Sequence, residues 1–406
     1  MSTPGPRARS PRVAAMVIIV FLIGGVTGAF VDRAIVDRKP AATSTTSSTT
    51  APTNTTGSGT TTPSSTSSTT TSAPPAALAL ALITPVSGAK GVAANAPITV
   101  TFSAPLSKSS PTPVLAPAPS GSWSANGETF TFVPSSDFMP LSRVTLTVPG
   151  GPAGVLGAAG GRLNQSVTER FQIANGSVVR VQQLLSLLDY SPLSWTSARA
   201  PLPTSDSATQ IAAIYKPPEG TYGWRSRGWP AQLRAMWHPG VNDAFTRGLI
   251  MSFEADHALI PNGTIGASLW PALISALASN TLNTGGYNYA FANKAAPESL
   301  TIYHNGRVVV KSQANTGIGV SPTPDGTFPV FERLRQQVMR GTNPNGSKYA
   351  DLVQYIAYFN GNDAVHYMDR ADYGIPQSLG CIELPLLDAA KAWPYLAYGT
   401  LVTIVN

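Results

Sequence analysis

Short stretches of alternating apolar and polar residues mark the chain from about residue 80 to residue 173. The segments Ile98–Phe102, Phe130–Val133 and Val144–Val148 alternate or are rich in β-branched residues, which is typical of strands with one buried face. Pro, Gly, Ser and Asn turns separate them at short intervals. The pattern predicts a small β-sandwich over residues 78–175.

The apolar spacing changes to that of a helix in the following hundred residues. Apolar side chains recur three or four positions apart at Val181, Leu184, Leu185 and Leu188, as on the buried face of an α-helix. A second apolar segment around Trp270 follows an Asn-Gly turn. We therefore predict a small helical domain over residues 176–282.

Strand patterns return in the final segment, residues 283–406. Leu300–Tyr303 and Val308–Val310 flank an Asn305-Gly306 pair, which is a strong signal for a two-residue hairpin turn. Leu401–Val405 predicts a closing strand. This segment is expected to be a mostly-β domain.

An uncharged apolar run of 19 residues, Val13–Val31, is close to the length that crosses a bilayer as a helix. Three arginines precede it, which predicts a cytoplasmic tail at residues 1–12 and an extracytoplasmic remainder. A cleaved signal peptide is the alternative. Because the run is longer than a typical signal-peptide core, we favour a single-pass membrane anchor, and either interpretation exports the rest of the chain.

The segment after this run is rich in Ser, Thr, Ala and Pro, and no residue from Pro40 to Ala89 is charged. Such a composition cannot bury enough apolar surface to form a core, so residues 32–77 are expected to be a disordered linker. The formal net charge is +7, of which residues 1–40 contribute +4. The exported part therefore lacks a strongly basic face, which argues against nucleic acid as a partner.

Cys381 is the single cysteine among 406 residues. Exported proteins usually pair their cysteines, so this one is either a buried small hydrophobe or a reactive group. Its neighbours favour the reactive role, because Ser378-Leu379-Gly380 directly precede it and His366 lies 15 residues earlier. An imidazole that takes the proton of a thiol makes it a good nucleophile.

Gly380 leaves space for a substrate carbonyl beside Cys381, where neighbouring amides would form an oxyanion hole worth about 3 kcal/mol per donor.

The order of histidine and cysteine along the chain distinguishes this pattern from other cysteine enzymes. All histidines precede Cys381, unlike in papain-like wall peptidases, and no arginine follows it, unlike in sortases.

Two stretches of the final segment resemble the YkuD-type L,D-transpeptidase family. The first is Thr316-Gly317 followed by the TPDGTF sequence of Thr323–Phe328, and the second is Val365–Tyr367 followed by the SLGCIELP sequence of Ser378–Pro385. Residues 78–175 also resemble bacterial immunoglobulin-like modules, and residues 176–282 resemble a small peptidoglycan-binding domain. The whole chain is thus similar to multi-domain actinobacterial members of the family.

This resemblance implies acyl transfer between peptidoglycan stem peptides. Cys381 would attack the carbonyl between the third, diamino-acid residue and D-alanine, with His366 as base and then as acid for the leaving amine. The acyl-thioester would pass to a side-chain amine of a neighbouring stem. The resemblance also implies that the Tyr367 carbonyl orients the histidine, that carbapenems acylate the enzyme, and that no metal or organic cofactor takes part.

Three residues depart from the usual family pattern. Leu379 replaces a second histidine, the bulky Tyr367 replaces a small residue, and Glu383 replaces an arginine, so that a carboxylate is expected to repel substrate carboxylates near the nucleophile. Together with Gly380 and Ser378 they form the predicted oxyanion and substrate-binding set. The departures leave two alternatives open, an L,D-carboxypeptidase and a non-catalytic peptidoglycan-binding protein.

Overall fold

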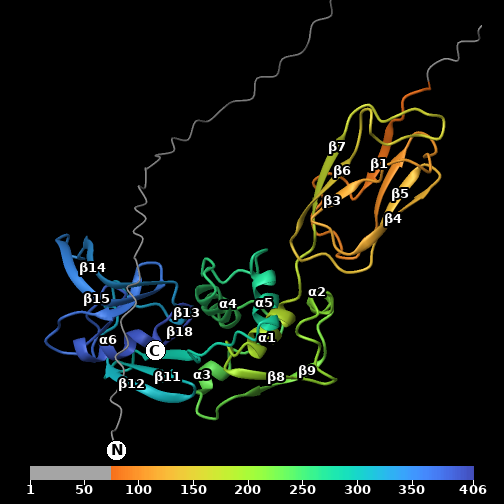
Figure 1. Cartoon of the computed structure of the whole chain (residues 1–406). Helices are drawn as coiled ribbons and strands as arrows, with labels where there is room; N and C mark the ends of the chain where they lie inside the picture. The colour runs from red at the N-terminus through yellow and green to blue at the C-terminus, as the bar shows by residue number, and fades with distance from the viewer. Residues whose placement is uncertain (1–74) are drawn as a thin grey trace, which may run out of the picture. The chain divides into compact units, whose positions relative to one another are not determined.

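The computed structural model describes residues 75–406 (Figure 1). The predicted cytoplasmic tail, the apolar run 13–31 and nearly all of the predicted linker 32–77 lie outside the described residues. Among residues 75–406, no helix has the length and apolar character needed to span a bilayer.

The first described domain is the predicted β-sandwich. One antiparallel sheet has the order β1 (Leu80–Thr84), β2 (Ile98–Phe102), β5 (Thr129–Pro134), β4 (Gly121–Asn126). The second has the order β3 (Val114–Ala116), β6 (Arg143–Val148), β7 (Val167–Gln172). Alternate side chains of both sheets, such as Val100 and Leu146, are fully buried in one shared core, so the period-two pattern predicted this domain correctly.

Residues 176–282 form a helical segment with one unexpected antiparallel strand pair. Its elements are α1 (Val178–Leu187), β8 (Leu193–Ser197), α2 (Ser207–Tyr215), β9 (Gly220–Trp224), α3 (Ala231–Arg234), α4 (Ala244–Asp256) and α5 (Leu269–Ala278). The predicted apolar face of α1 is buried. The antiparallel β8–β9 pair was not foreseen, because its strands have no regularly buried alternate face to produce a pattern. Peptidoglycan binding by this segment stays a prediction.

The final domain contains two sheets that enclose a second core. One has the order β12 (Arg307–Gln313), β11 (Ser299–His304), β10 (Asn288–Asn293), β18 (Leu401–Val405), β13 (Gly326–Pro329). The other has the order β14 (Glu332–Thr342), β15 (Lys348–Asn360), β16 (Asp363–Tyr367), β17 (Ile382–Leu384), and α6 (Leu386–Ala392) and a 3₁₀ turn (Trp393–Tyr395) follow β17. Ile302 and Val402 from the first sheet meet Val365 and Ile382 from the second.

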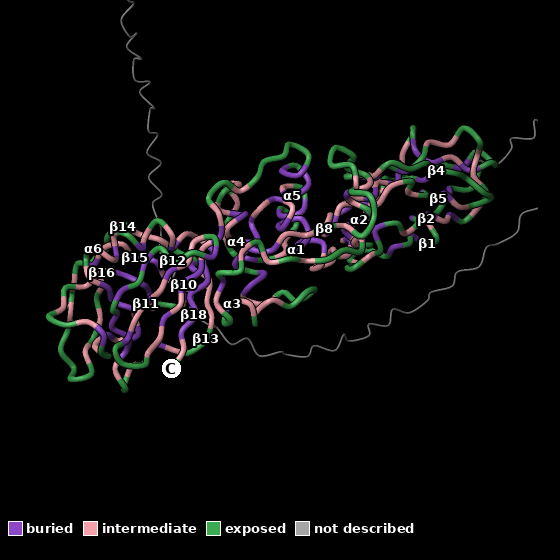
Figure 2. The backbone as a smooth tube through the Cα atoms, turned by 90° about the horizontal axis from the view of Figure 1, so that it is seen from below, coloured by how far each residue is buried: buried purple, intermediate pink, exposed green. Residues whose placement is uncertain are grey.

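The predicted hairpin between β11 and β12 is confirmed. Asn305 and Gly306 connect the strands with φ angles of 49° and 78°, which only a few residue types adopt readily. The buried positions of these strands are purple in Figure 2.

The helical segment and the final domain share a hydrophobic core. Phe245 and Leu249 of α4 belong to the same buried cluster as Tyr287, Tyr289 and Leu401 of the β domain. Gly248 allows this close packing, because a side chain there would collide with the backbone of Gly399. The sequence boundary near residue 282 is therefore not a break in the packing.

We expect Phe245→Ala to lower the free energy of unfolding by about 3–5 kcal/mol, because it opens a cavity in this shared core. The midpoint in urea should fall equally when followed by circular dichroism and by the reactivity of Cys381. Val308→Ala, at an exposed position of β12, is the control and should change stability by less than about 0.5 kcal/mol. A shift seen by circular dichroism alone would show that the β domain unfolds independently.

Candidate active site

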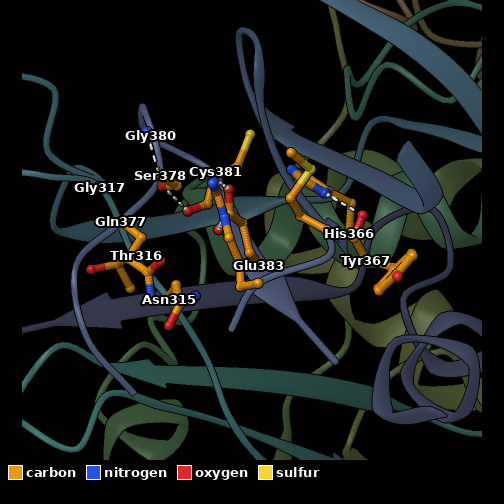
Figure 3. A network of polar contacts seen from close by, with 12 residues as sticks. Asn315, Thr316, Gly317, His366, Tyr367, Gln377, Ser378, Gly380, Cys381 and Glu383 are labelled. Atoms are coloured by element: carbon orange, nitrogen blue, oxygen red, sulfur yellow. Dashed lines mark hydrogen bonds and ion pairs between the residues drawn. The ribbon is translucent and has the colours of Figure 1, made fainter. Parts of the chain in front are cut away.

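The parallel pairing of β16 with β17 brings the candidate base and nucleophile together. His366 lies opposite Glu383, and Val365 lies opposite Ile382. Opposed residues point to the same face of a sheet and side chains alternate along a strand, so Cys381 shares the face of His366 and Glu383. Figure 3 shows Cys381 and His366 on neighbouring segments.

A pocket of about 840 Å³ covers this face. Of the predicted site residues, it is lined by Cys381, His366, Ser378, Leu379 and Glu383. Tyr367 and Gly380 are not among the lining residues, but they form hydrogen bonds with His366 and Ser378, which are. Further lining residues come from β14, from β15, from the start of β16 and from the loop after it, where no sequence motif marks them: Arg340, Tyr349, Asp351, Tyr358, Asp363 and Arg370.

His366 is held as a neutral imidazole with one free nitrogen. Its side chain is buried, and Nδ1 lies 2.9 Å from the backbone oxygen of Tyr367. A carbonyl only accepts hydrogen bonds, so Nδ1 carries the proton and Nε2 keeps its lone pair. Burial lowers the pKa of His366, while the Tyr367 carbonyl and Glu383 oppose this and Arg370 adds to it. The ring is therefore uncharged at neutral pH and can accept a proton.

Cys381 is a neutral thiol in the resting site. Its Sγ donates a weak hydrogen bond to the Asn362 carbonyl at 3.8 Å, and within the described residues no hydrogen bond joins Sγ to His366. Burial raises the pKa of Cys381 to about 12; the Ala364 amide opposes this, and the carboxylates of Asp363 and Glu383 add to it. The site is thus not a preformed thiolate–imidazolium pair.

Three hydroxyl groups hold three successive backbone carbonyls around the nucleophile. The pairs are Ser321 Oγ to Leu379 O at 2.9 Å, Thr323 Oγ1 to Gly380 O at 2.9 Å, and Ser378 Oγ to Cys381 O at 2.6 Å. Ser378 Oγ also accepts from the Gly380 amide at 3.2 Å. In a trans peptide the C=O and N–H point in opposite directions, so anchoring Gly380 O directs the Cys381 N–H away from Thr323.

The two motif-bearing stretches meet at this turn. Thr323 accepts a hydrogen bond from the Gly317 amide at 2.8 Å, and Ser378 N donates to Thr316 O at 3.0 Å. Asn315 and Glu383 exchange backbone hydrogen bonds of 2.9 and 3.0 Å (Figure 3). The TG and TPDGTF sequences therefore build the wall behind the nucleophile turn.

Gly380 occupies a position that other residues cannot adopt without strain. Its φ angle is +125°, and a Cβ on it would collide with the carboxylate of Asp363. Asp363 therefore lies directly against the backbone of the nucleophile turn, and both the conformation and the space require glycine here.

Glu383 does not present a free charge to the pocket, contrary to the expectation from sequence. Its side chain is 5% exposed and forms a two-pronged ion pair with Arg370, from Nε to Oε2 at 2.8 Å and from Nη2 to Oε1 at 2.6 Å. The guanidinium compensates the carboxylate, so simple repulsion of substrate carboxylates by Glu383 is not supported. Arg370 lies 13 residues before Glu383 in a loop, where no pattern indicates the pairing.

Two segments of the chain match known domain families. Residues 287–404 match the family model of the YkuD L,D-transpeptidase catalytic domain, and residues 73–172 match that of the Big_5 bacterial Ig-like domain. The chain thus carries a YkuD L,D-transpeptidase catalytic domain behind an Ig-like domain.

Several solved structures are similar to this chain. An L,D-transpeptidase from Mycobacterium smegmatis is 14% identical over 82% of this chain and 100% of its own, with a TM-score of 0.28. L,D-transpeptidase 3 from Mycobacterium tuberculosis is 14% identical over 81% and 99%, also at 0.28. The catalytic domain of the E. faecium L,D-transpeptidase is 24% identical over 29% and 96%, at 0.27. TM-scores this low give no basis for transferring a function from these structures to this chain. A search of curated protein sequences found no match.

The neutral thiol predicts an unusual pH dependence of alkylation by iodoacetamide. Because the pKa of Cys381 is raised to about 12, the thiolate fraction should grow about tenfold per pH unit through pH 10, whereas a free cysteine levels off above about 8.5. The pKa of His366 is lowered, so no step should appear near 6.5. N-acetylcysteine is the control. A rate plateau near neutral pH would instead indicate a preformed ion pair.

The buried hydroxyl of Thr323 can be tested with a matched pair of substitutions. Thr323→Val removes partners from the Gly317 amide and the Gly380 carbonyl, and we expect it to lower the free energy of unfolding by about 2–3 kcal/mol. Thr323→Ser keeps the hydroxyl and should cost less than about 1.5 kcal/mol. Urea denaturation measures both, and a loss in Thr323→Val no larger than that in Thr323→Ser would contradict the role of the hydroxyl.

Proposed function

We propose that this protein is a peptidoglycan L,D-transpeptidase that cross-links stem peptides through their third residues and releases D-alanine. The observation that carries the proposal is the placement of Cys381 beside the neutral His366, on one face of β16–β17 and under a large pocket. This pair lies within the segment that matches the YkuD catalytic domain. The pocket volume of about 840 Å³ suits an extended peptide substrate.

In the first half-reaction, Sγ of Cys381 attacks the carbonyl carbon of the third residue while Nε2 of His366 takes the thiol proton. Attack requires the thiol to leave its contact with the Asn362 carbonyl. The Cys381 amide is the best-placed oxyanion donor, because the Gly380 amide already donates to Ser378. The C–N bond then breaks as His366 protonates the departing amine of D-alanine.

In the second half-reaction, a side-chain amine of a neighbouring stem attacks the thioester carbonyl. His366 takes a proton from this amine, the C–S bond breaks, and the thiol is regenerated with its proton. The product is an amide between the third residues of two stems. No metal or organic cofactor enters this scheme.

The substrate lies outside the cytoplasm, which agrees with the exported orientation inferred from the first 31 residues. We place the catalytic domain on the cell-wall side of the membrane, attached through the apolar run Val13–Val31. Accessibility of the catalytic domain to protease added to intact spheroplasts tests this placement.

We expect Cys381→Ser in the full chain to reduce formation of cross-linked muropeptide dimers by at least about 100-fold, because a serine hydroxyl ionises far less readily than a thiol. Incubation with a carbapenem should add one adduct to the native chain and none to the variant, as measured by intact-mass spectrometry.

Each outcome of this assay discriminates between functions. Dimers from the Cys381→Ser variant would exclude Cys381 as the nucleophile. Shortened monomers in place of dimers from the native chain would indicate a carboxypeptidase. Unchanged muropeptides without any carbapenem adduct would indicate a non-catalytic binding protein, and circular dichroism confirms that each variant is folded.

A further inference from the structure

The pocket contains one cation whose position is set by a buried partner. Arg370 pairs through Nε and Nη2 with the two carboxylate oxygens of Glu383. A guanidinium has five N–H donors in a rigid plane, so this pair leaves both N–H groups of Nη1 and one of Nη2 for a ligand. The two-pronged geometry also fixes the orientation of that plane.

The two charges of the pair are not equally accessible. The side chain of Glu383 is 5% exposed, whereas that of Arg370 is 29% exposed, and both line the pocket. The guanidinium of Arg370 therefore faces the pocket, and the carboxylate of Glu383 lies behind it. Apart from this pair, the charged side chains that line the pocket are Asp351, Asp363 and Arg340.

Arg370 lies close to the reacting groups. Its partner Glu383 stands opposite His366 and two residues after Cys381 on the same sheet face. The positive charge of Arg370 acts on His366, whose pKa it helps to lower. A substrate group bound by Arg370 would thus lie next to the base and the nucleophile.

The proposed donor substrate carries an anion at the corresponding place. The leaving D-alanine is the C-terminal residue of the stem, so its carboxylate is separated from the scissile nitrogen by one carbon atom. A carboxylate so near the scissile bond must be accommodated beside the base that protonates the nitrogen. Arginine matches a carboxylate with paired, charge-assisted hydrogen bonds.

We propose that Arg370 determines donor specificity by binding the carboxylate of the C-terminal D-alanine, and that Glu383 positions Arg370 for this contact. The inference rests on the proposed transpeptidase function and names the side chain that would recognise the C-terminal carboxylate of its donor stem. Glu383 is a positioning residue, since it acts through Arg370.

The test compares two synthetic tetrapeptide stems, one ending in D-alanine and one in D-alaninamide. Binding is measured by calorimetry to the full chain carrying Cys381→Ala, so that no reaction occurs. The carboxylate stem should bind about 10-fold more tightly than the amide, as expected for a charge-assisted contact at a partly exposed site. This comparison needs no change at Arg370.

Substitutions then assign the preference to the residue. Arg370→Gln should abolish the carboxylate preference and leave amide binding within about twofold, and Arg370→Lys should retain part of it. Arg340→Gln removes the same charge from an exposed arginine of the same pocket and should keep the preference.

The possible outcomes distinguish the role of Arg370 from the proposed transpeptidase function. Equal binding of the two stems by the native pocket, or equal weakening of both by Arg370→Gln, would overturn the role of Arg370 while leaving stem recognition intact. Absence of binding by either stem would instead count against the proposed function. If Arg370→Gln does not fold, a full carboxylate preference in Arg370→Lys would overturn the need for the paired donors of the guanidinium.

Discussion

The candidate site depends on the register of one short parallel strand pair. β17 has three residues, and its apolar side chains Ile382 and Leu384 are fully buried in the core of the domain. A slip of one residue would move these side chains into the pocket and the carboxylate of Glu383 into the core, which is energetically prohibitive. Core packing therefore enforces the register that sets Cys381 beside His366.

Electrostatics around this strand pair keep the resting site uncharged at its reactive atoms. Burial favours the neutral forms of both His366 and Cys381, and the Glu383 carboxylate is compensated by Arg370. A thiol with a raised pKa needs a base to remove its proton before it can act as a nucleophile. The same ion pair fixes the orientation of the Arg370 guanidinium in the pocket.

The helical segment contributes to the catalytic domain through packing. Side chains of α4 share a core with β10 and β18, and Gly248 and Gly399 allow the two backbones to approach closely. β18 lies between β10 and β13 in its sheet. The contact with α4 therefore supports the sheet that shares a core with β16 and β17. The segment therefore has a structural role, whether or not it also binds peptidoglycan.

The sequence by itself determined the elements with a regular pattern: the β-sandwich, the apolar face of α1, the Asn305-Gly306 hairpin and the candidate pair Cys381 and His366. Local spacing and residue chemistry are sufficient for these. Only the tertiary structure decided the charge state of the pair, the anchoring of the nucleophile turn by Thr323, and the partnership of Glu383 with Arg370. These depend on burial and on contacts between segments that are distant in the sequence, and the periodicity of the sequence does not reveal such contacts.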